Sequence, residues 1–261
     1  MDVAIVIPAR FASKRLPGKP MVEIKGVSLL RRVWRIATSV KGVSEVYVAT
    51  DDQRIADHAA SFGAKWLMTP SDLATGTDRV HRALELMEKR PDAVINLQGD
   101  AVLTPPWVVQ ALVDEFHADP TVGMVTAAVH CSWQQLAEIE RLKAQSPTSG
   151  TLVTMDKFGR ALYFSKAIIP FLRSKDFAVP PVHRHIGIYG YASAVLDRLA
   201  KLEQSPLEKA EQLEQLRALE NGIPIKVAVV DYRNRTHGSV DTPEDIPVIE
   251  AIIAREGELV P

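Results

Sequence analysis

In the first 120 residues the chain repeats one pattern four times: an apolar run, a polar turn, and a segment with helical spacing. The apolar runs, rich in β-branched residues, are 3–9, 45–52, 64–69 and 92–100. The helical segments are 28–40, 53–63, 76–89 and 105–119. This alternation predicts an α/β fold with a mostly parallel central sheet and helices on both faces. In such sheets a ligand binds beyond the carboxyl ends of the strands.

The second half is less regular and has no internal repeat or obvious linker. Strands are expected at 122–130, 150–156, 161–165, 185–193 and 226–231. Residues 205–222 predict one amphipathic helix, with Ser205 as N-cap, Pro206 in the first turn and Gly222 as the C-terminal stop. A closing helix is expected at 242–256. We therefore expect a single domain over residues 1–261.

Composition and charge exclude several classes of protein. The net charge of −1 offers no bulk field that would favour nucleic acid or a membrane. A single cysteine, Cys131, excludes an internal disulfide and a thiolate metal cluster. The opening residues lack the basic lead and long apolar core of a secretory signal. No stretch approaches a transmembrane length. A cytoplasmic location is the expectation.

The turn after the first apolar run, PARFASKRLPGKP, is unusually basic. It carries Arg10, Arg15 and Lys19, with Lys14 as a further cation, and Gly18 permits a tight turn. It lacks the glycines of a Walker loop or a dinucleotide fingerprint. The alternative is a solvated charged loop. Its position at a strand exit favours binding of a polyanion such as a triphosphate.

Two carboxylates are candidate ligands for a hard cation such as Mg²⁺. Asp100 ends the fourth apolar run, in NLQGD, where Gly99 leaves room for a ligand to approach the backbone. Asp241, in SVDTPED, stands just before the closing helix, so the sequence fits helix capping and metal binding equally well. Mg²⁺ would complete its shell with water and substrate phosphate.

Other polar residues have a structural alternative beside a functional one. Asp51 and Asp52 precede a helix, and capping explains at least one of them. TGTDR fits a helix start at Thr77 or Asp78, with Arg79 left as a possible phosphate contact. His183 and His185 share one face of a strand, but no third ligand follows at suitable spacing, so zinc is not expected.

Taken together, these residues resemble a known family. IPARFASKRLPGKP, VATDD, TGTDR, NLQGD, ALYFSKAIIPF, HIGIYGY, SPLEKAEQLEQLRALENG and VDTPED are similar, in order, to the 3-deoxy-manno-octulosonate (Kdo) cytidylyltransferases. The resemblance covers residue 4 to about 245. It implies a Rossmann-like nucleotidyltransferase fold with a smaller lobe, within about 125–200, that contributes to a homodimer. It also implies Mg²⁺-dependent transfer of CMP from CTP to a 3-deoxy-sugar acid, with a product for lipopolysaccharide or capsule assembly.

The resemblance also assigns roles to positions of this chain. Arg15, Lys19 and Asp100 would act in catalysis, and Asp100 and Asp241 would bind the metal. The nucleotide would contact Pro8, Ala9, Arg10, Arg15, Lys19, Thr77, Arg79 and Gln98. The sugar would contact Gln98, Lys166, His185, Tyr189, Glu214 and Gln215. Backbone groups around Pro8 to Arg10 are expected to select cytosine.

The pattern departs from the family at three positions that concern the sugar. Ala101 stands where the family has a carboxylate, Lys166 where arginine is common, and Leu152 where a lysine is usual. An ammonium cannot reproduce the bidentate contact of a guanidinium with a carboxylate. Two readings stay open: neutral change in an enzyme for Kdo, or a different sugar acid, modified or sialate-like. The remaining alternatives are a sugar-1-phosphate nucleotidyltransferase and a non-catalytic nucleotide-binding relative.

Overall fold

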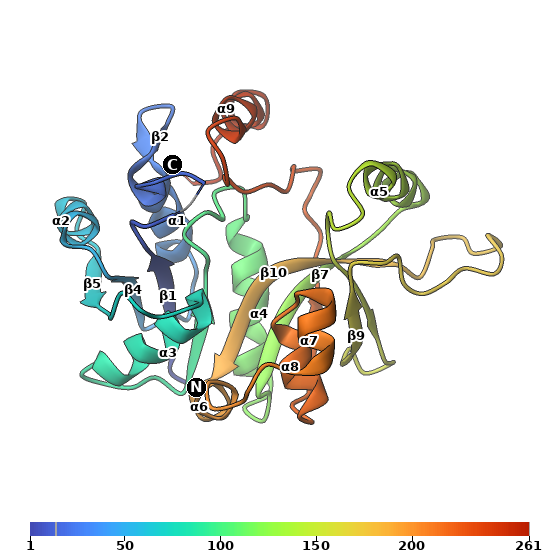
Figure 1. Ribbon diagram of the computed structural model, residues 1–261, viewed down its shortest axis with the longest axis horizontal. Helices are drawn as coiled ribbons and strands as arrows, with labels where there is room; N and C mark the ends of the chain where they lie inside the picture. The colour runs from blue at the N-terminus through green and yellow to red at the C-terminus, as the bar shows by residue number, and fades with distance from the viewer. Residues whose placement is uncertain (14, 261) are drawn as a thin grey trace.

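The computed structural model describes residues 1–13 and 15–260, so Lys14 and Pro261 lie outside the described residues. Within this range one nine-stranded sheet has the order β11-β7-β10-β6-β1-β4-β5, and β8 and β9 extend it beside β10 (Figure 1). The strands are β1 Val3–Ala9, β4 Glu45–Thr50, β5 Lys65–Met68, β6 Ala93–Asn96, β7 Met124–His130, β8 Leu152–Met155, β9 Ala161–Ser165, β10 His183–Ala192 and β11 Ile225–Val229. A short hairpin, β2 Glu23–Ile24 with β3 Val27–Ser28, stands apart.

The sheet is mostly parallel, which confirms the predicted fold class. β1 pairs in parallel with β4 and β6, and β5 continues beside β4. β10 runs antiparallel to both β6 and β7, and a β-bulge interrupts its pairing with β7 between Ile186 and Tyr189. A bulge re-aims the side chains of a strand. This strand carries His185 and Tyr189, two of the predicted sugar contacts.

Helices cover both faces of the sheet (Figure 1). Alternate side chains of β1 point to opposite faces, so Ile5 and Val6 belong to different apolar clusters. The helices are α1 Leu29–Thr38, α2 Gln53–Ser61, α3 Gly76–Leu86, α4 Pro106–Ala118, α5 Trp133–Gln145, α6 Ser193–Leu199, α7 Pro206–Glu211, α8 Gln215–Glu220 and α9 Asp245–Glu256. The first cluster includes residues of α1, α2, α4 and α9, and the second includes residues of α3, α6 and α8.

The prediction of one continuous helix over 205–222 was wrong. The segment forms α7 and α8, separated by Gln212 in the left-handed region at φ 55°. The predicted start is confirmed, because Ser205 is the N-cap, Pro206 is in the first turn, and the Glu208 carboxylate accepts from the Ser205 N–H at 3.2 Å. Glu208 then bonds Arg217 across the break, at 2.5 and 2.8 Å. This buried ion pair stabilises the bend, which a helical pattern alone does not reveal.

The chain between 125 and 200 adds β8, β9 and α5 at one end of the sheet, on the right of Figure 1. A small apolar cluster here joins Leu136 of α5 to Cys131, Leu152 and Val182. That this part forms a separate dimerisation lobe stays a prediction. Among the described residues, no helix combines the length and the apolar character needed to span a bilayer.

Candidate active site

The basic turn after β1 is folded back on Phe11. The carbonyl oxygen of Phe11 accepts hydrogen bonds from the backbone N–H groups of Ser13 and Gly18, at 2.8 and 3.0 Å. Gly18 has φ 69°, so the tight turn predicted there is confirmed. The guanidinium of Arg54, itself held by the Asp52 carboxylate, lies 3.4 Å from the centre of the Phe11 ring. The start of α2 therefore supports the basic turn.

At the open rim of the sheet, this turn meets two carboxylates that are distant in sequence. Lys19 Nζ lies 2.7 Å from Asp100 Oδ2 and 3.1 Å from Asp241 Oδ1. Arg15 contacts the same Asp241 oxygen at 3.0 Å. Lys19 is largely buried, with 14% of its side chain exposed, whereas Arg15 is 65% exposed. The structure thus brings together the four charged residues singled out for catalysis and metal binding.

The capping interpretation of Asp241 does not hold in the structure. The backbone N–H groups of Asp241 and Thr242 each donate to Asp245 Oδ2 at 2.8 Å. These bonds hold the pKa of Asp245 below its ordinary value, with the N–H of Asp241 as the larger cause. Asp245 therefore organises the turn before α9, and the Asp241 carboxylate is directed to Lys19 and Arg15.

A cleft of about 520 Å³ opens beside this charge cluster. It lies between the ends of β1 and β6 and the start of α3, as the rule for parallel sheets predicts. The space that Gly99 leaves is filled by protein, because a Cβ there would lie 2.9 Å from the Pro8 carbonyl oxygen. The predicted nucleotide contacts that line the cleft are Pro8, Ala9, Arg10, Arg15, Lys19, Arg79 and Gln98.

Arg79 lines the cleft, but its guanidinium is already held by protein groups. It donates to Thr69 Oγ1 at 2.5 Å and to Asp51 Oδ2 at 3.1 Å. The Arg79 and Asp51 side chains are 3% and 10% exposed. Asp51 is thus explained by this ion pair, while Asp52 caps α2 as predicted. Arg79 therefore has a structural role that its sequence context did not reveal.

The predicted start of the third helix needs correction. Thr75, rather than Thr77 or Asp78, is the N-cap of α3, and Asp78 closes a reciprocal capping box with it. The reason is local: Thr75 Oγ1 accepts from the Asp78 N–H, and the Asp78 carboxylate accepts from the Thr75 N–H, both at 3.0 Å. Thr77 is consequently inside the helix and lines a second cavity.

The second cavity has a volume of about 260 Å³ and shares Gly76 and Gln98 with the cleft. Burial raises the pKa values of Glu214 and Tyr189. The amide nitrogens of Asn96 and Gln215 are buried, and neither has a hydrogen-bond partner among the described residues. The predicted sugar contacts in its lining are Gln98, Tyr189, Glu214 and Gln215. Thr77, which was predicted to contact the nucleotide, and Asn96 also line it.

Asn96 is a polar residue that sequence reasoning missed. Gln98 Nε2 donates to Asn96 Oδ1 at 2.8 Å, which orients the Asn96 amide. Its NH₂ group has no hydrogen-bond partner within residues 1–13 and 15–260. The signal was present, because Asn96 is the polar residue within the apolar run AVINL. A buried amide without a partner is costly unless a ligand satisfies it.

The two remaining predicted sugar contacts, His185 and Lys166, are outside the lining of this cavity. The His185 ring is 5.4 Å from the Tyr189 ring, and its Nε2 is 2.9 Å from Thr126 Oγ1. Burial, with the Lys166 charge as a smaller cause, lowers the pKa of His185 to about 3, so the ring is neutral at pH 7. Lys166 Nζ donates to Thr151 Oγ1 at 3.0 Å.

Two positions that depart from the family pattern have an apolar packing role. Ala101 packs, partly buried, against the main apolar cluster. Leu152 is 1% exposed and belongs to the small cluster with Leu136. An alanine and a leucine at these positions are consistent with their apolar surroundings.

The carboxylates of Asp100 and Asp241 suit a hard cation that takes its remaining ligands from substrate and water. No group of three or more His, Cys, Asp or Glu side chains suited to a metal occurs among residues 1–13 and 15–260. Asp100 and Asp241 nevertheless contact one shared ammonium, which shows that two carboxylates can reach a common cation. Two carboxylates next to a cleft suit Mg²⁺, which would bind phosphate and water as its other ligands.

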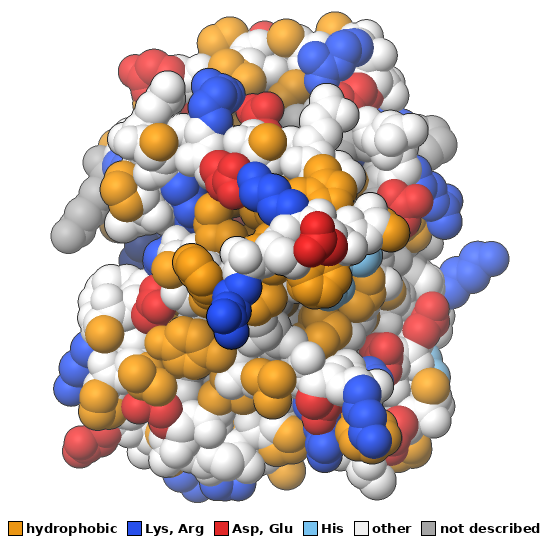
Figure 2. Space-filling model, turned by 90° about the vertical axis from the view of Figure 1, so that its right-hand side faces the viewer, with side chains coloured by type: hydrophobic (Ala, Val, Ile, Leu, Met, Phe, Trp, Pro, Cys, Tyr) orange, Lys and Arg blue, Asp and Glu red, His pale blue; other side chains and the backbone are white. Residues whose placement is uncertain are grey.

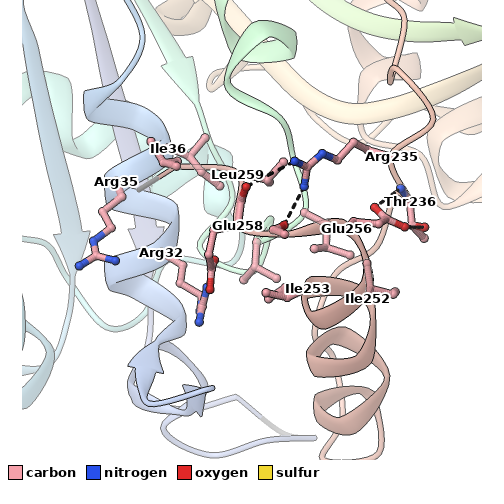
Figure 3. A pocket seen from close by; sticks show the side chains of 14 residues that line it. Arg32, Arg35, Ile36, Arg235, Thr236, Ile252, Ile253, Glu256, Glu258 and Leu259 are labelled. Carbon is pink, nitrogen blue, oxygen red and sulfur yellow. Dashed lines mark hydrogen bonds and ion pairs between the residues drawn. The ribbon is translucent and has the colours of Figure 1, made fainter.

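A smaller cavity of about 20 Å³ lies between α1 and the C-terminal segment (Figure 3). Arg32 donates to the Ile24 carbonyl and to Glu258, and Arg235 donates to the Gly257 carbonyl. Figure 3 shows Arg235 reaching over the chain that follows α9. The cavity is too small for a nucleotide, and its cations fasten the C-terminal segment.

Comparison with known proteins identifies the class. The cytidylyltransferase family matches residues 4–227. The chain is 49% identical, over the full length of both proteins, to the 3-deoxy-manno-octulosonate cytidylyltransferase of Maricaulis maris. It is 41% identical to the 8-amino-3,8-dideoxy-manno-octulosonate cytidylyltransferase of Shewanella sediminis, over 97% of this chain and 99% of that one.

Solved structures agree with the sequence comparison. The structure of CMP:2-keto-3-deoxy-manno-octonic acid synthetase complexed with CTP is 36% identical, with a TM-score of 0.87, and covers 98% of this chain and 100% of that one. A cytidylyltransferase from Leptospira borgpetersenii, at 17% identity and a TM-score of 0.62, shares the fold. The chain belongs to the 3-deoxy-manno-octulosonate cytidylyltransferase family. The predicted family, fold class and enzyme class are confirmed, and the roles of individual site residues stay predictions.

Proposed function

We propose that this protein transfers CMP from CTP to a 3-deoxy-sugar acid, Kdo or its 8-amino form, and releases pyrophosphate. The observation that carries the proposal is the convergence of Arg15, Lys19, Asp100 and Asp241 at the mouth of a cleft of nucleotide size. The adjoining cavity, lined by free amides and a buried carboxyl group, suits a hydroxyl-rich sugar. Gln98 and Gly76 line both spaces, so the two substrates would meet there.

The reaction joins the anomeric oxygen of the sugar acid to the α-phosphorus of CTP. The oxygen–phosphorus bond forms as the bond to pyrophosphate breaks, and the hydroxyl proton is released. Negative charge grows on the phosphoryl oxygens and the leaving group. Lys19 and Arg15 would stabilise that charge, and Gln98 would orient the sugar.

Mg²⁺ is proposed as the cofactor, held by Asp100 and Asp241. When bound, it would neutralise part of the triphosphate charge. The carboxylates would then exchange some of their contact with Lys19 for contact with the metal, which leaves the ammonium available to phosphate. Pro8, Ala9 and Arg10 line the part of the cleft at the end of β1, where their backbone groups would select the base.

A homodimer is proposed from the resemblance, with support from one face of the molecule. Leu142, Phe158, Leu162, Phe171, Phe177 and Val179 are large apolar side chains that are exposed. They belong to the segment 142–179, at the end of the sheet that carries β8, β9 and α5. Figure 2, which views that end, shows hydrophobic side chains spread over the face. Light scattering of the purified protein would give twice the monomer mass; a monomer mass would contradict the proposal.

The test of the proposed function is pyrophosphate release from CTP with Mg²⁺ and a panel of acids: Kdo, 8-amino-3,8-dideoxy-manno-octulosonate and a sialic acid. Turnover with one of the first two acids is expected, and a mass spectrum should show the CMP-sugar. Three outcomes would contradict the proposed function: pyrophosphate release with UTP in place of CTP, release with a sugar 1-phosphate as acceptor, or no release with any of the three acids.

A further inference from the structure

The backbone of Lys166 is held from both sides. Its N–H donates to Glu211 Oε2 at 2.8 Å, and its carbonyl oxygen accepts from Lys143 Nζ at 2.5 Å. Glu211 belongs to α7 and Lys143 to α5, and they are 45 and 23 residues from Lys166 in the chain. Glu211 also accepts from Ser165 Oγ at 2.6 Å. Two helices therefore fix the place where β9 ends.

The ammonium group of Lys143 is fully used in this contact. An ammonium has three donors, and Lys143 directs them to the carbonyl oxygens of Ser149, Gly150 and Lys166, at 2.5, 3.2 and 2.5 Å. Hydrogen bonds from a charged donor are stronger than neutral ones. Lys143 thus joins the segment before β8 to the end of β9.

The two joined segments are connected to the sugar cavity through His185. Lys166 Nζ donates to Thr151 Oγ1 at 3.0 Å, and the Thr151 carbonyl accepts from the His185 N–H at 2.9 Å. The His185 ring lies 5.4 Å from Tyr189, which lines the cavity. A continuous row of contacts therefore leads from the held backbone to the cavity.

Lys166 is a cation next to this row of contacts, and the cavity at the end of the row has the acidic residue Glu214 in its lining. The Lys166 charge reaches His185, because it is one cause of the lowered pKa of that histidine. An acid acceptor carries a carboxylate that needs a cation. A lysine side chain is flexible and lacks the planar, bidentate guanidinium of arginine. The position of its ammonium group therefore depends on how well its backbone is fixed.

We propose that Lys143, together with Glu211, is a positioning residue for recognition of the acceptor's carboxylate, and that it acts through Lys166 and Thr151. This inference rests on the proposed function, because it assigns the acid-binding side of the same site. Lys143 itself contacts backbone carbonyls and does not touch the acid.

The test compares steady-state kinetics of the full-length wild type with Lys143→Met, Lys143→Arg and Glu211→Gln. Arg141→Met is the matched control, since Arg141 is an exposed cation on the same helix, paired with Glu138 at 3.0 Å. We expect Lys143→Met to raise KM for the sugar acid by about tenfold or more, the scale of one charged hydrogen bond, with KM for CTP within about twofold. Lys143→Arg should recover part of the loss.

A general loss of structure would change both KM values and lower kcat, whereas a positioning role changes KM for the acid. Thermal unfolding of each variant, with CTP present and absent, checks that the nucleotide site is intact. An unchanged KM for the acid in Lys143→Met, or an equal rise in Arg141→Met, would overturn the inference and leave the proposed function standing. Wild-type protein that turns over no sugar acid would overturn both.

Discussion

Lys19 Nζ lies 2.7 Å from Asp100 Oδ2, although 81 residues separate the two in sequence. The contact joins the basic turn after β1 to the end of β6, two neighbouring parallel strands. Asp241, 222 residues from Lys19, completes the cluster. The parallel sheet makes this possible, because the carboxyl ends of its strands share one edge.

Replacing Lys19 is expected to lower kcat more than it weakens nucleotide binding. Lys19→Met removes the largely buried ammonium that is proposed to face the charge developing on the triphosphate. Loss of one such group lowers kcat by about a hundredfold, whereas Lys19→Arg should keep part of the rate. Pyrophosphate release measures the effect. Lys65→Met, an exposed lysine on the edge strand β5, is the control, and an equal loss there would contradict the assignment.

Asp100→Asn and Asp241→Asn should each weaken the response to Mg²⁺. An amide keeps the shape of the carboxylate but removes the charge that a hard cation needs. We expect the Mg²⁺ concentration for half-maximal rate to rise by about tenfold or more in each variant, on the scale of one lost charged contact. Asp114→Asn on α4, an exposed carboxylate bonded to Gln110, is the control. Unchanged Mg²⁺ dependence in both site variants would remove these residues as metal ligands.

The Arg79–Asp51 pair predicts a large effect on stability. Asp51→Asn leaves the Arg79 guanidinium buried without its counter-charge, and breaking a buried pair in this way costs about 3–5 kcal/mol. The double variant Asp51→Asn/Arg79→Met should lose less free energy of unfolding than the sum of the losses in the two single variants. Urea unfolding gives the free energies. Additive losses would show that the two side chains act independently.

The lowered pKa of His185 predicts that the free energy of unfolding falls as the pH is lowered. Its pKa is about 3 in the folded protein and 6.5 as an ordinary histidine, so protons bind more readily to the unfolded chain. The stabilisation is therefore present above pH 6.5 and is lost as the pH falls toward 3. Between pH 7 and pH 5 this loss amounts to about 2 kcal/mol. His185→Gln should lose less stability than the wild type over that range, and an equal loss in both proteins would contradict it.

The sequence was sufficient to predict those parts of the fold in which the local pattern agrees with the tertiary structure. The four strand–helix units follow from their apolar runs, and the helix starts at Asp52 and Ser205 follow from the carboxylates of Asp52 and Glu208, which bond nearby backbone N–H groups. The basic turn was located because a parallel sheet places each strand end at the ligand edge. These features depend on residues close in the chain or on one topological rule.

Other features depend on contacts that sequence does not display. The bend at Gln212 is stabilised by Glu208 and Arg217, and the local pattern there is that of an unbroken helix. The ion pair of Arg79 is another such contact, because its partner Asp51 lies 28 residues away in the chain. The contacts of Lys143 are of the same kind, since its acceptors are backbone carbonyls, which have no sequence signature.

The most direct measurement is a calorimetric titration of the wild-type protein and of Asp100→Asn/Asp241→Asn with CTP, with Mg²⁺ and with EDTA. If the basic turn and the two aspartates surround one nucleotide, the wild type will bind one CTP per chain, and binding will weaken on removal of the metal or of both carboxylates. A wild type that takes up no CTP in the presence of Mg²⁺, or a double variant that binds it with unchanged affinity, would contradict the account.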